Sequence, residues 1–183
     1  MAEGAGDGGG GRAGDRSADP RAEWVRERQR AADVLDLEAG RGPVPVLDEA
    51  GAQDLLRRAR RIAVVGASPD RDRPSHSVMR YLQVQGYECV PVNPAARDVL
   101  GVPAFPTLEA AVAASGPFDI VDVFRRPEFT PPIARSAVAT GCGALWLQLG
   151  VVDWTAARIA HDGGLPVVMD RCTAIEHRKL RGR

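Results

Sequence analysis

Glycine, serine, arginine and histidine follow the short apolar run of residues 62–65, and together they can hold an anion. The run is rich enough in β-branched residues to predict a buried strand, and Gly66 after it suits a sharp turn or close approach of a ligand. A helix pattern opens near Ser75. Free backbone amides and the helix dipole at such a point favour a phosphate. Because Arg71 and Arg73 lie in the same loop, the stretch predicts a nucleotide-type pocket.

Two common nucleotide loops do not fit this pattern. NAD binding requires G-x-G-x-x-G and an acidic residue at the end of the second strand. Here Gly66 stands alone, and the second apolar run ends in Asn93-Pro94. A P-loop requires Gly-Lys-Ser or Gly-Lys-Thr, and neither occurs. The sequence therefore disfavours NAD and P-loop ATP hydrolysis.

Three further residues have side chains that can act in catalysis, but for each a packing or hydrogen-bonding role is the simpler interpretation. His76 opens a helix, where the dipole disfavours imidazolium, so we expect it to pack or to bond phosphate. Asp122 lies among apolar residues of a strand and is expected to hydrogen-bond a neighbouring loop or helix end. Cys172 follows the last strand and is expected to pack as a small apolar residue, with a mixed disulfide to a ligand thiol as the alternative. We predict no catalytic residue and no metal ligand.

Composition limits the class of protein. A chain of 183 residues has room for one domain and an extension, and 44% hydrophobic residues can build a core. There is no membrane-spanning apolar run and no signal-peptide pattern. Zero net charge and no clustered basic face argue against nucleic acid as a partner. The three cysteines lack zinc or redox spacing, which predicts free thiols and a cytoplasmic location.

The N-terminal part differs in character from the rest. Residues 1–22 are glycine, alanine and charge, and we expect a disordered tail. Residues 23–55 are expected to form a helical extension, in which Asp48 caps a helix that runs to about Arg60. The remaining residues, 56–183, are expected to form the ligand-binding domain.

In that domain, apolar runs alternate with helical patterns. Five runs are expected to form strands: 62–65, 87–92, 118–124, 144–149 and 165–169. The alternation predicts an α/β fold, a Rossmann-like doubly wound parallel sheet of about five strands with helices on both faces. Ligands of such sheets bind outside the carboxyl ends of the strands, where glycine and polar residues gather in this sequence.

Short local patterns predict the remaining strands and helices of the domain. Residues 100–105 are expected to form a short extended piece. Asp153 should cap a helix that ends near His161, and Thr173 with Glu176 has the spacing of a capping box for a last helix.

Several short motifs occur in one order and carry a family resemblance. They are Val65-Gly66-Ala67-Ser68, Arg73-Pro74-Ser75-His76, Tyr81-Leu82, Gly86-Tyr87, Pro91-Val92-Asn93-Pro94, Leu100-Gly101, residues 121–125, Trp146-Leu147-Gln148, Asp170-Arg171-Cys172 and Glu176-His177. Over about residues 56–180 the chain resembles the small stand-alone CoA-binding proteins. That family is similar in fold to the CoA-binding domain of the succinyl-CoA synthetase α subunit.

The resemblance implies that coenzyme A lies across the strand ends. The implied binding residues are Gly66, Ala67, Ser68, Arg73, Ser75 and His76 at the phosphates, Asn93 and Pro94 on the adenine-ribose side, Phe124 and Arg125 on the pocket wall, and Gln148 and Gly150 at the pantetheine arm. Members of the family often carry Lys or Arg directly after Asn-Pro, and this chain has Ala95, with Arg97 two residues later. Arg97 is the candidate replacement for the contact to the 3′-phosphate; the alternatives are weak CoA binding or a different nucleotide as the ligand.

The expected function is non-catalytic binding of a small nucleotide, CoA or acyl-CoA. Two alternatives stay open. The chain could be a subunit of an acyl-CoA synthetase-like system, acting only with an ATP-grasp partner. It could also be a regulatory module whose nucleotide occupancy controls a protein bound through the N-terminal arm.

Overall fold

The computed structural model describes residues 20–182. Most of the expected disordered tail lies outside these residues, and its last part, 20–22, begins a helix. In chain order the elements are α1 (Pro20–Glu38), α2 (Glu49–Arg58), β1 (Arg61–Val65), α3 (Pro74–Val84), β2 (Glu88–Val92), β3 (Asp98–Val99), β4 (Val102–Pro103), α4 (Leu108–Ser115), β5 (Ile120–Val123), the 3₁₀ turn η1 (Pro127–Phe129), α5 (Thr130–Ala139), β6 (Leu145–Leu147), α6 (Trp154–Asp162), β7 (Val167–Val168) and α7 (Thr173–Arg181).

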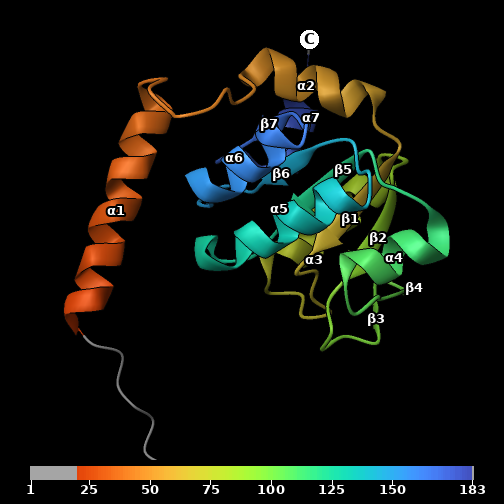
Figure 1. Ribbon diagram of the computed structural model, residues 1–183. Helices are drawn as coiled ribbons and strands as arrows, with labels where there is room; N and C mark the ends of the chain where they lie inside the picture. The colour runs from red at the N-terminus through yellow and green to blue at the C-terminus, as the bar shows by residue number, and fades with distance from the viewer. Residues whose placement is uncertain (1–19, 183) are drawn as a thin grey trace, which may run out of the picture.

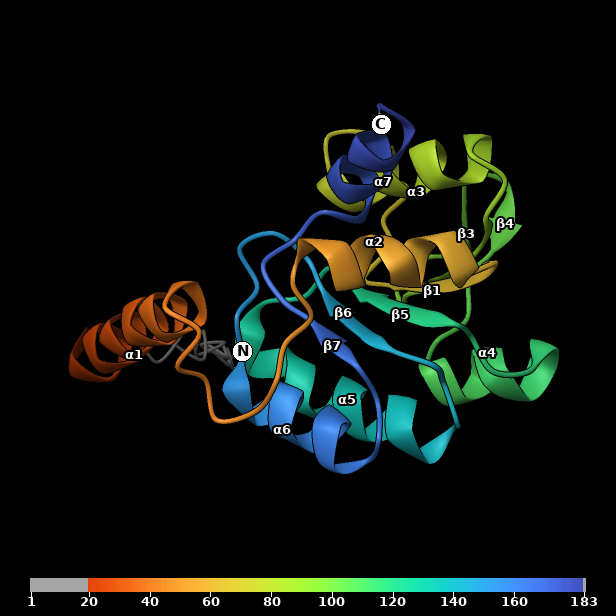
Figure 2. The same cartoon turned by 90° about the horizontal axis from the view of Figure 1, so that it is seen from above.

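A five-stranded parallel sheet with the order β2-β1-β5-β6-β7 forms the centre of the molecule (Figure 1). Helices α2, α3 and α7 cover one face, and α4, α5 and α6 cover the other (Figure 2). The predicted Rossmann-like α/β fold is therefore confirmed. The order reverses between β1 and β5, which creates the switch-point crevice at the carboxyl ends of these strands.

Alternation of side chains along β1 explains how the two layers of the core form. Ala63 and Val65 belong to the apolar cluster on the α4-α5-α6 side, whereas Ile62 and Val64 belong to the cluster on the opposite side. Successive side chains of a strand point to opposite faces, so a strand covered on both sides must be apolar throughout.

Helix starts confirm two expected caps and correct a third. Asp48 accepts from the Gly51 amide at 2.8 Å, and Asp153 accepts from the Ala156 amide at 2.7 Å. Thr173 is already the first residue of α7, after Cys172 at the cap position. The expected capping box is wrong because the Thr173 hydroxyl donates to Asp122, a partner that lies 51 positions earlier in the chain.

The expected extended piece at residues 100–105 is a tight antiparallel pair. Strands β3 and β4 form a separate two-stranded sheet through Asp98↔Pro103 and Val99↔Val102. Phe105 then forms a parallel bridge with Val92, which brings the start of α4 beside the end of β2.

The N-terminal segment runs along the far edge of the sheet. Leu47 donates its amide to the carbonyl of Val167 at 2.8 Å, so the linker between α1 and α2 lies beside β7. The indole of Trp154 donates to the carbonyl of Asp33 in α1 at 3.2 Å. Helix α2 packs on α7, and its Ala52 is fully buried. Within residues 20–182, no helix combines the length and apolar character needed to cross a membrane.

Candidate functional site

Gly66 makes the turn at the end of β1 with a φ of +86°, where other residues are strained. A Cβ at this position would lie 2.7 Å from the carbonyl oxygen of Phe124. The turn after β5 therefore packs directly on the backbone of Gly66. This contact gives Gly66 a structural requirement in addition to the predicted approach of a phosphate.

The loop after Gly66 is organised by its own side chains. Asp70 accepts the amide of Asp72 at 3.0 Å and donates its own amide to the Ser68 hydroxyl at 3.2 Å. Among the described residues, no group accepts a hydrogen bond from the backbone amide of Ser68 or of Ser75. Ser75 lies in the first turn of α3, so its amide adds to the positive end of the helix dipole.

Arg71 and Arg73, the two cations of this loop, make few contacts with the rest of the protein. Arg73 is exposed, and its Nε lies 3.7 Å from Asp70, a long contact between exposed groups that contributes little stability. Arg71 is also exposed. His76 is buried in the first turn of α3, and it has no hydrogen bond or ion pair to a carboxylate within residues 20–182.

Asn93 joins the end of β2 to this loop. Its side-chain amide donates to the carbonyl of Ala67 at 2.7 Å, and its side-chain oxygen accepts from the amide of Ala95 at 2.9 Å. Both ends of the side chain are therefore used within the protein. Asn93 positions the Ala67 loop whether or not it also contacts a ligand.

A cavity of about 250 Å³ lies at the switch point. Four of the expected site residues line it: Gly66, Asn93, Pro94 and Arg125. The sequence did not single out the facing wall, which comes from α4 and α5. Thr107 caps α4, and the hydroxyl of Ser136 donates to Glu109. This hydrogen bond lowers the pKa of Glu109, which keeps its carboxylate ionised in the cavity wall.

The turn after β5 forms another side of the cavity. Arg125 is exposed, and its guanidinium carbon lies 5.4 Å from the centre of the Phe129 ring, within the range of a cation–π contact. Phe124 is half-buried and bonds the carbonyl of Val65 through its amide at 2.8 Å. The backbone here is fixed, while the Arg125 side chain faces solvent.

Gln148 lies in a buried polar cluster. Its Nε2 donates to Asp122 and to Thr173, both at 2.8 Å, and the Thr173 hydroxyl donates to Asp122 at 3.1 Å. All three residues are buried. Burial raises the pKa of Asp122 to about 7, although both hydrogen bonds oppose the shift because they stabilise the ionised form.

Gly150 lies beyond β6, two strands away from β1 in the sheet. Its amide donates to Asp170 at 2.6 Å. This bond joins the end of β6 to the end of β7, where Asp170 itself has a positive φ of 52°. The expected site residues thus fall into two groups, one around the ends of β1, β2 and β5 and one around the end of β6.

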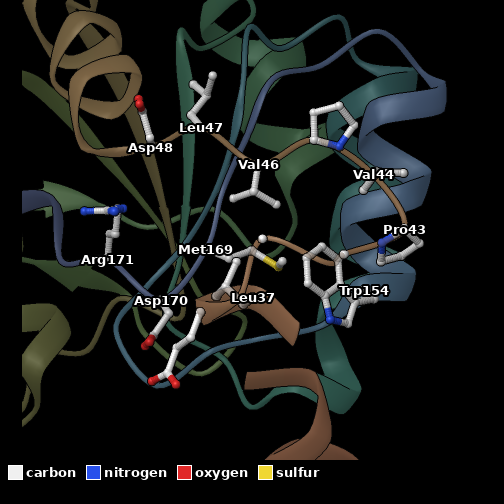
Figure 3. A pocket seen from close by; sticks show the side chains of 14 residues that line it. Leu37, Pro43, Val44, Val46, Leu47, Asp48, Trp154, Met169, Asp170 and Arg171 are labelled. Atoms are coloured by element: carbon white, nitrogen blue, oxygen red, sulfur yellow. The ribbon is translucent and has the colours of Figure 1, made fainter. Parts of the chain in front are cut away.

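The structure also contains a larger cavity, of about 750 Å³, that the sequence did not predict (Figure 3). It lies between the linker before α2, the Trp154 indole and the residues that follow β7. Its walls come from segments more than 100 positions apart, which explains why no local pattern indicated it.

Comparison with known proteins finds relatives that match most of this chain and nearly all of their own length. The chain is 40% identical over 129 residues to the uncharacterized protein YneT of Bacillus subtilis (strain 168), which covers 70% of this chain and 93% of that protein. A hypothetical protein from Pyrococcus horikoshii OT3 has a TM-score of 0.70 at 33% identity, covering 74% of this chain and 94% of that one. The cell-free ID.343 protein from Thermus thermophilus has a TM-score of 0.67 at 36% identity, covering 73% and 99%.

The family itself is identified by a match over most of the folded region. Residues 60–178 match the family described as the CoA binding domain. The matched range begins just before β1 and ends within α7, so it contains every strand of the parallel sheet. The chain belongs to the CoA-binding-domain family.

Proposed function

We propose that this protein binds coenzyme A or an acyl-CoA at the carboxyl ends of the parallel strands, without catalysing a reaction on it. The observation that carries the proposal is the pair of backbone amides at Ser68 and Ser75, which no described residue uses. They lie in the loop after β1 and at the start of α3, where a phosphate is favoured by the helix dipole. The exposed Arg73 supplies a cation beside them.

The switch-point cavity supports the placement of the adenine-ribose part. It lies beside the loop after β1, and Asn93 and Pro94 form one of its walls. Its Glu109 and Ser136 offer oxygen atoms, which suit the amino group and hydroxyl groups of a nucleoside. Arg97 follows β2 and is exposed. It is the residue proposed to bind the 3′-phosphate.

The lack of an assembled catalytic set supports a binding role. Catalysis of acyl transfer requires a nucleophile, a base and a group that orients the base. Among the described residues, His76 has no orienting carboxylate. Asp122 is fully engaged in the buried cluster with Gln148 and Thr173.

Titration with CoA, dephospho-CoA, NAD and ATP, followed by thermal unfolding, tests the proposal. A ligand that binds only the native state stabilises it by RT ln(1 + [L]/Kd), about 2.7 kcal/mol at a hundredfold excess over Kd. We expect CoA to give the largest shift and dephospho-CoA a smaller one. Stabilisation by NAD or ATP without any by CoA would refute the proposal.

Two arginine variants test which residues contact the phosphates of CoA. Arg73→Ala should weaken CoA binding by more than about tenfold, because a charge-assisted hydrogen bond contributes roughly 1.5–3 kcal/mol. Arg80→Ala is the matched control, since Arg80 is exposed on the same helix and lies beyond its first turn. Arg97→Ala should reduce the preference for CoA over dephospho-CoA. Equal losses in all three variants would point to a nonspecific effect of charge.

A further inference from the structure

The 750 Å³ cavity has an apolar wall built by three segments (Figure 3). In the close view Leu37, Val46, Trp154 and Met169 gather on one side of the space, and Asp170 and Arg171 lie on the other. Its volume lies within the range of small-molecule pockets, about 300–1,000 Å³. The Leu37 and Val46 part of this wall falls outside residues 60–178, the range that matches the family.

The cavity lies at the distance that a pantetheine arm reaches. Three steps across the sheet, β1 to β5 to β6 to β7, separate the phosphate loop from the end of β7. At about 4.8 Å per step this is roughly 14 Å. A pantetheine arm of about twelve chain atoms, equivalent to about four residues, extends over roughly 14 Å. A fully extended arm from a CoA phosphate at the loop after β1 is therefore long enough to place the sulfur at the end of β7.

One hydrogen bond joins the end of β6, on the proposed pantetheine path, to the cavity beside the end of β7. Gly150 follows β6, and its amide bonds Asp170 at 2.6 Å. Asp170 is in turn a lining residue of the cavity. The last protein group on the proposed pantetheine path and the first group of the cavity are thus in direct contact.

Three of the four charged residues that line the cavity already have partners within the protein. Asp48 caps α2, Asp170 binds Gly150, and Arg171 binds Glu176 at 3.2 Å. Apart from the Glu38 carboxylate, the side chains that the cavity offers to a ligand are those of its apolar wall. Its lining carries the carboxylates of Glu38, Asp48 and Asp170 against the single cation of Arg171, and this excess disfavours an anionic group.

We propose that this cavity receives the acyl group of a CoA thioester, and that the preferred acyl group is an uncharged hydrocarbon chain. The inference rests on the proposed CoA-binding function and names its ligand class. The linker before α2 forms the outer wall, because Leu47 is bonded to β7 and Val46 faces the cavity.

Calorimetric titration of the full chain with CoA, butyryl-CoA, octanoyl-CoA and succinyl-CoA tests the proposal. Each fully buried methylene strengthens binding roughly fourfold. We expect octanoyl-CoA to bind at least tenfold more tightly than CoA, butyryl-CoA to lie between them, and succinyl-CoA to bind no more tightly than CoA. If CoA binds but all four affinities agree, the acyl site is refuted while CoA binding stands.

Val46→Asp places a charge in the apolar wall. It should abolish the advantage of octanoyl-CoA and leave the affinity for CoA unchanged, which also shows that the variant is folded. Val84→Asp is the matched control, because Val84 is an exposed valine on α3. If Val46→Asp does not fold, Val46→Phe fills the same space and should give the same loss.

Two further outcomes would refute the acyl site. If octanoyl-CoA still binds more tightly than CoA in both Val46 variants, the octanoyl group must bind outside this cavity, and the inference is overturned. If neither CoA nor any thioester binds, the proposed function fails, and the acyl site fails with it.

Discussion

The side-chain amide of Asn93 donates a 2.7 Å hydrogen bond to the carbonyl oxygen of Ala67. This bond joins the end of β2 to the loop that follows β1, two segments 26 positions apart in the chain. The same side chain accepts the amide of Ala95. One residue thus fixes both the proposed phosphate loop and the turn beside the switch-point cavity.

Replacing Asn93 with alanine should loosen the loop. The loss of the bond to Ala67 should cost about 1 kcal/mol of stability. Urea denaturation measures this loss, and hydrogen exchange of the amides of residues 66–73 should become faster. Asn93→Asp retains the acceptor for Ala95 and removes the donor to Ala67, so it should show the same faster exchange. Normal exchange in Asn93→Asp would contradict the role of the bond to Ala67.

Gly66→Ala should be strongly destabilising. The added Cβ would lie 2.7 Å from the Phe124 carbonyl, and the φ of +86° is already strained for alanine. Backbone strain of this kind costs about 1–3 kcal/mol before the steric clash is added. Gly86→Ala is the matched control, because Gly86 has a φ of +95° and no atom within 4 Å of its Cβ position. Equal losses of stability would show that the contact with Phe124 is unimportant.

Asp122 should make the protein less stable as pH rises toward 8. Its pKa is raised to about 7 in the fold, against about 3.9 in an unfolded chain, so the folded state binds the proton more tightly. The stabilisation is fully present below about pH 4 and is lost as pH rises through about 7. A shift of this size corresponds to roughly 4 kcal/mol across that range.

Asp122→Asn isolates this effect, because its amide oxygen can still accept from Gln148. Urea midpoints at pH 5, 6, 7 and 8 should fall less for the variant than for the natural protein. His177 acts in the opposite direction, since burial lowers its pKa and its contribution is lost as pH falls. It is present in both proteins and cancels in the difference. Parallel pH curves for the two proteins would count against a perturbed Asp122.

Gly42→Ala should displace the N-terminal segment. A Cβ at Gly42 would lie 1.9 Å from an atom of the Trp154 indole, so the ring or the linker must move. The hydrogen bond from Trp154 to Asp33 would then weaken, which we expect to appear as a red shift in tryptophan fluorescence. Gly40→Ala is the control, because nothing lies within 4 Å of its Cβ position. An unchanged spectrum in Gly42→Ala would rule out this packing.

The three cysteines should differ in their reaction with iodoacetamide. Cys172 is partly exposed, whereas Cys89 and Cys142 are buried. Burial also raises the pKa of Cys89 to about 12, which leaves almost no reactive thiolate at neutral pH. Mass spectrometry of the native protein should find Cys172 alkylated first. Faster alkylation of Cys89 would indicate local opening of β2.

The sequence by itself determined the local structure of the chain. The apolar runs of the strands, the glycine turn at residue 66 and the caps Asp48 and Asp153 were all predicted, because each depends on neighbouring residues. Alternation of strands and helices further predicted the parallel sheet. The corrected capping box shows the limit of such patterns. Thr173 and Glu176 have the spacing of a capping box, but the Thr173 hydroxyl donates instead to the buried carboxylate of Asp122 in β5.

Only the tertiary structure decided which distant groups meet. The cluster of Asp122, Gln148 and Thr173 forms because β5, β6 and the start of α7 lie side by side. The large cavity forms because the linker before α2 runs along β7 and faces Trp154. Neither arrangement follows from spacing, since both depend on strand order and on how segments far apart in the chain pack together.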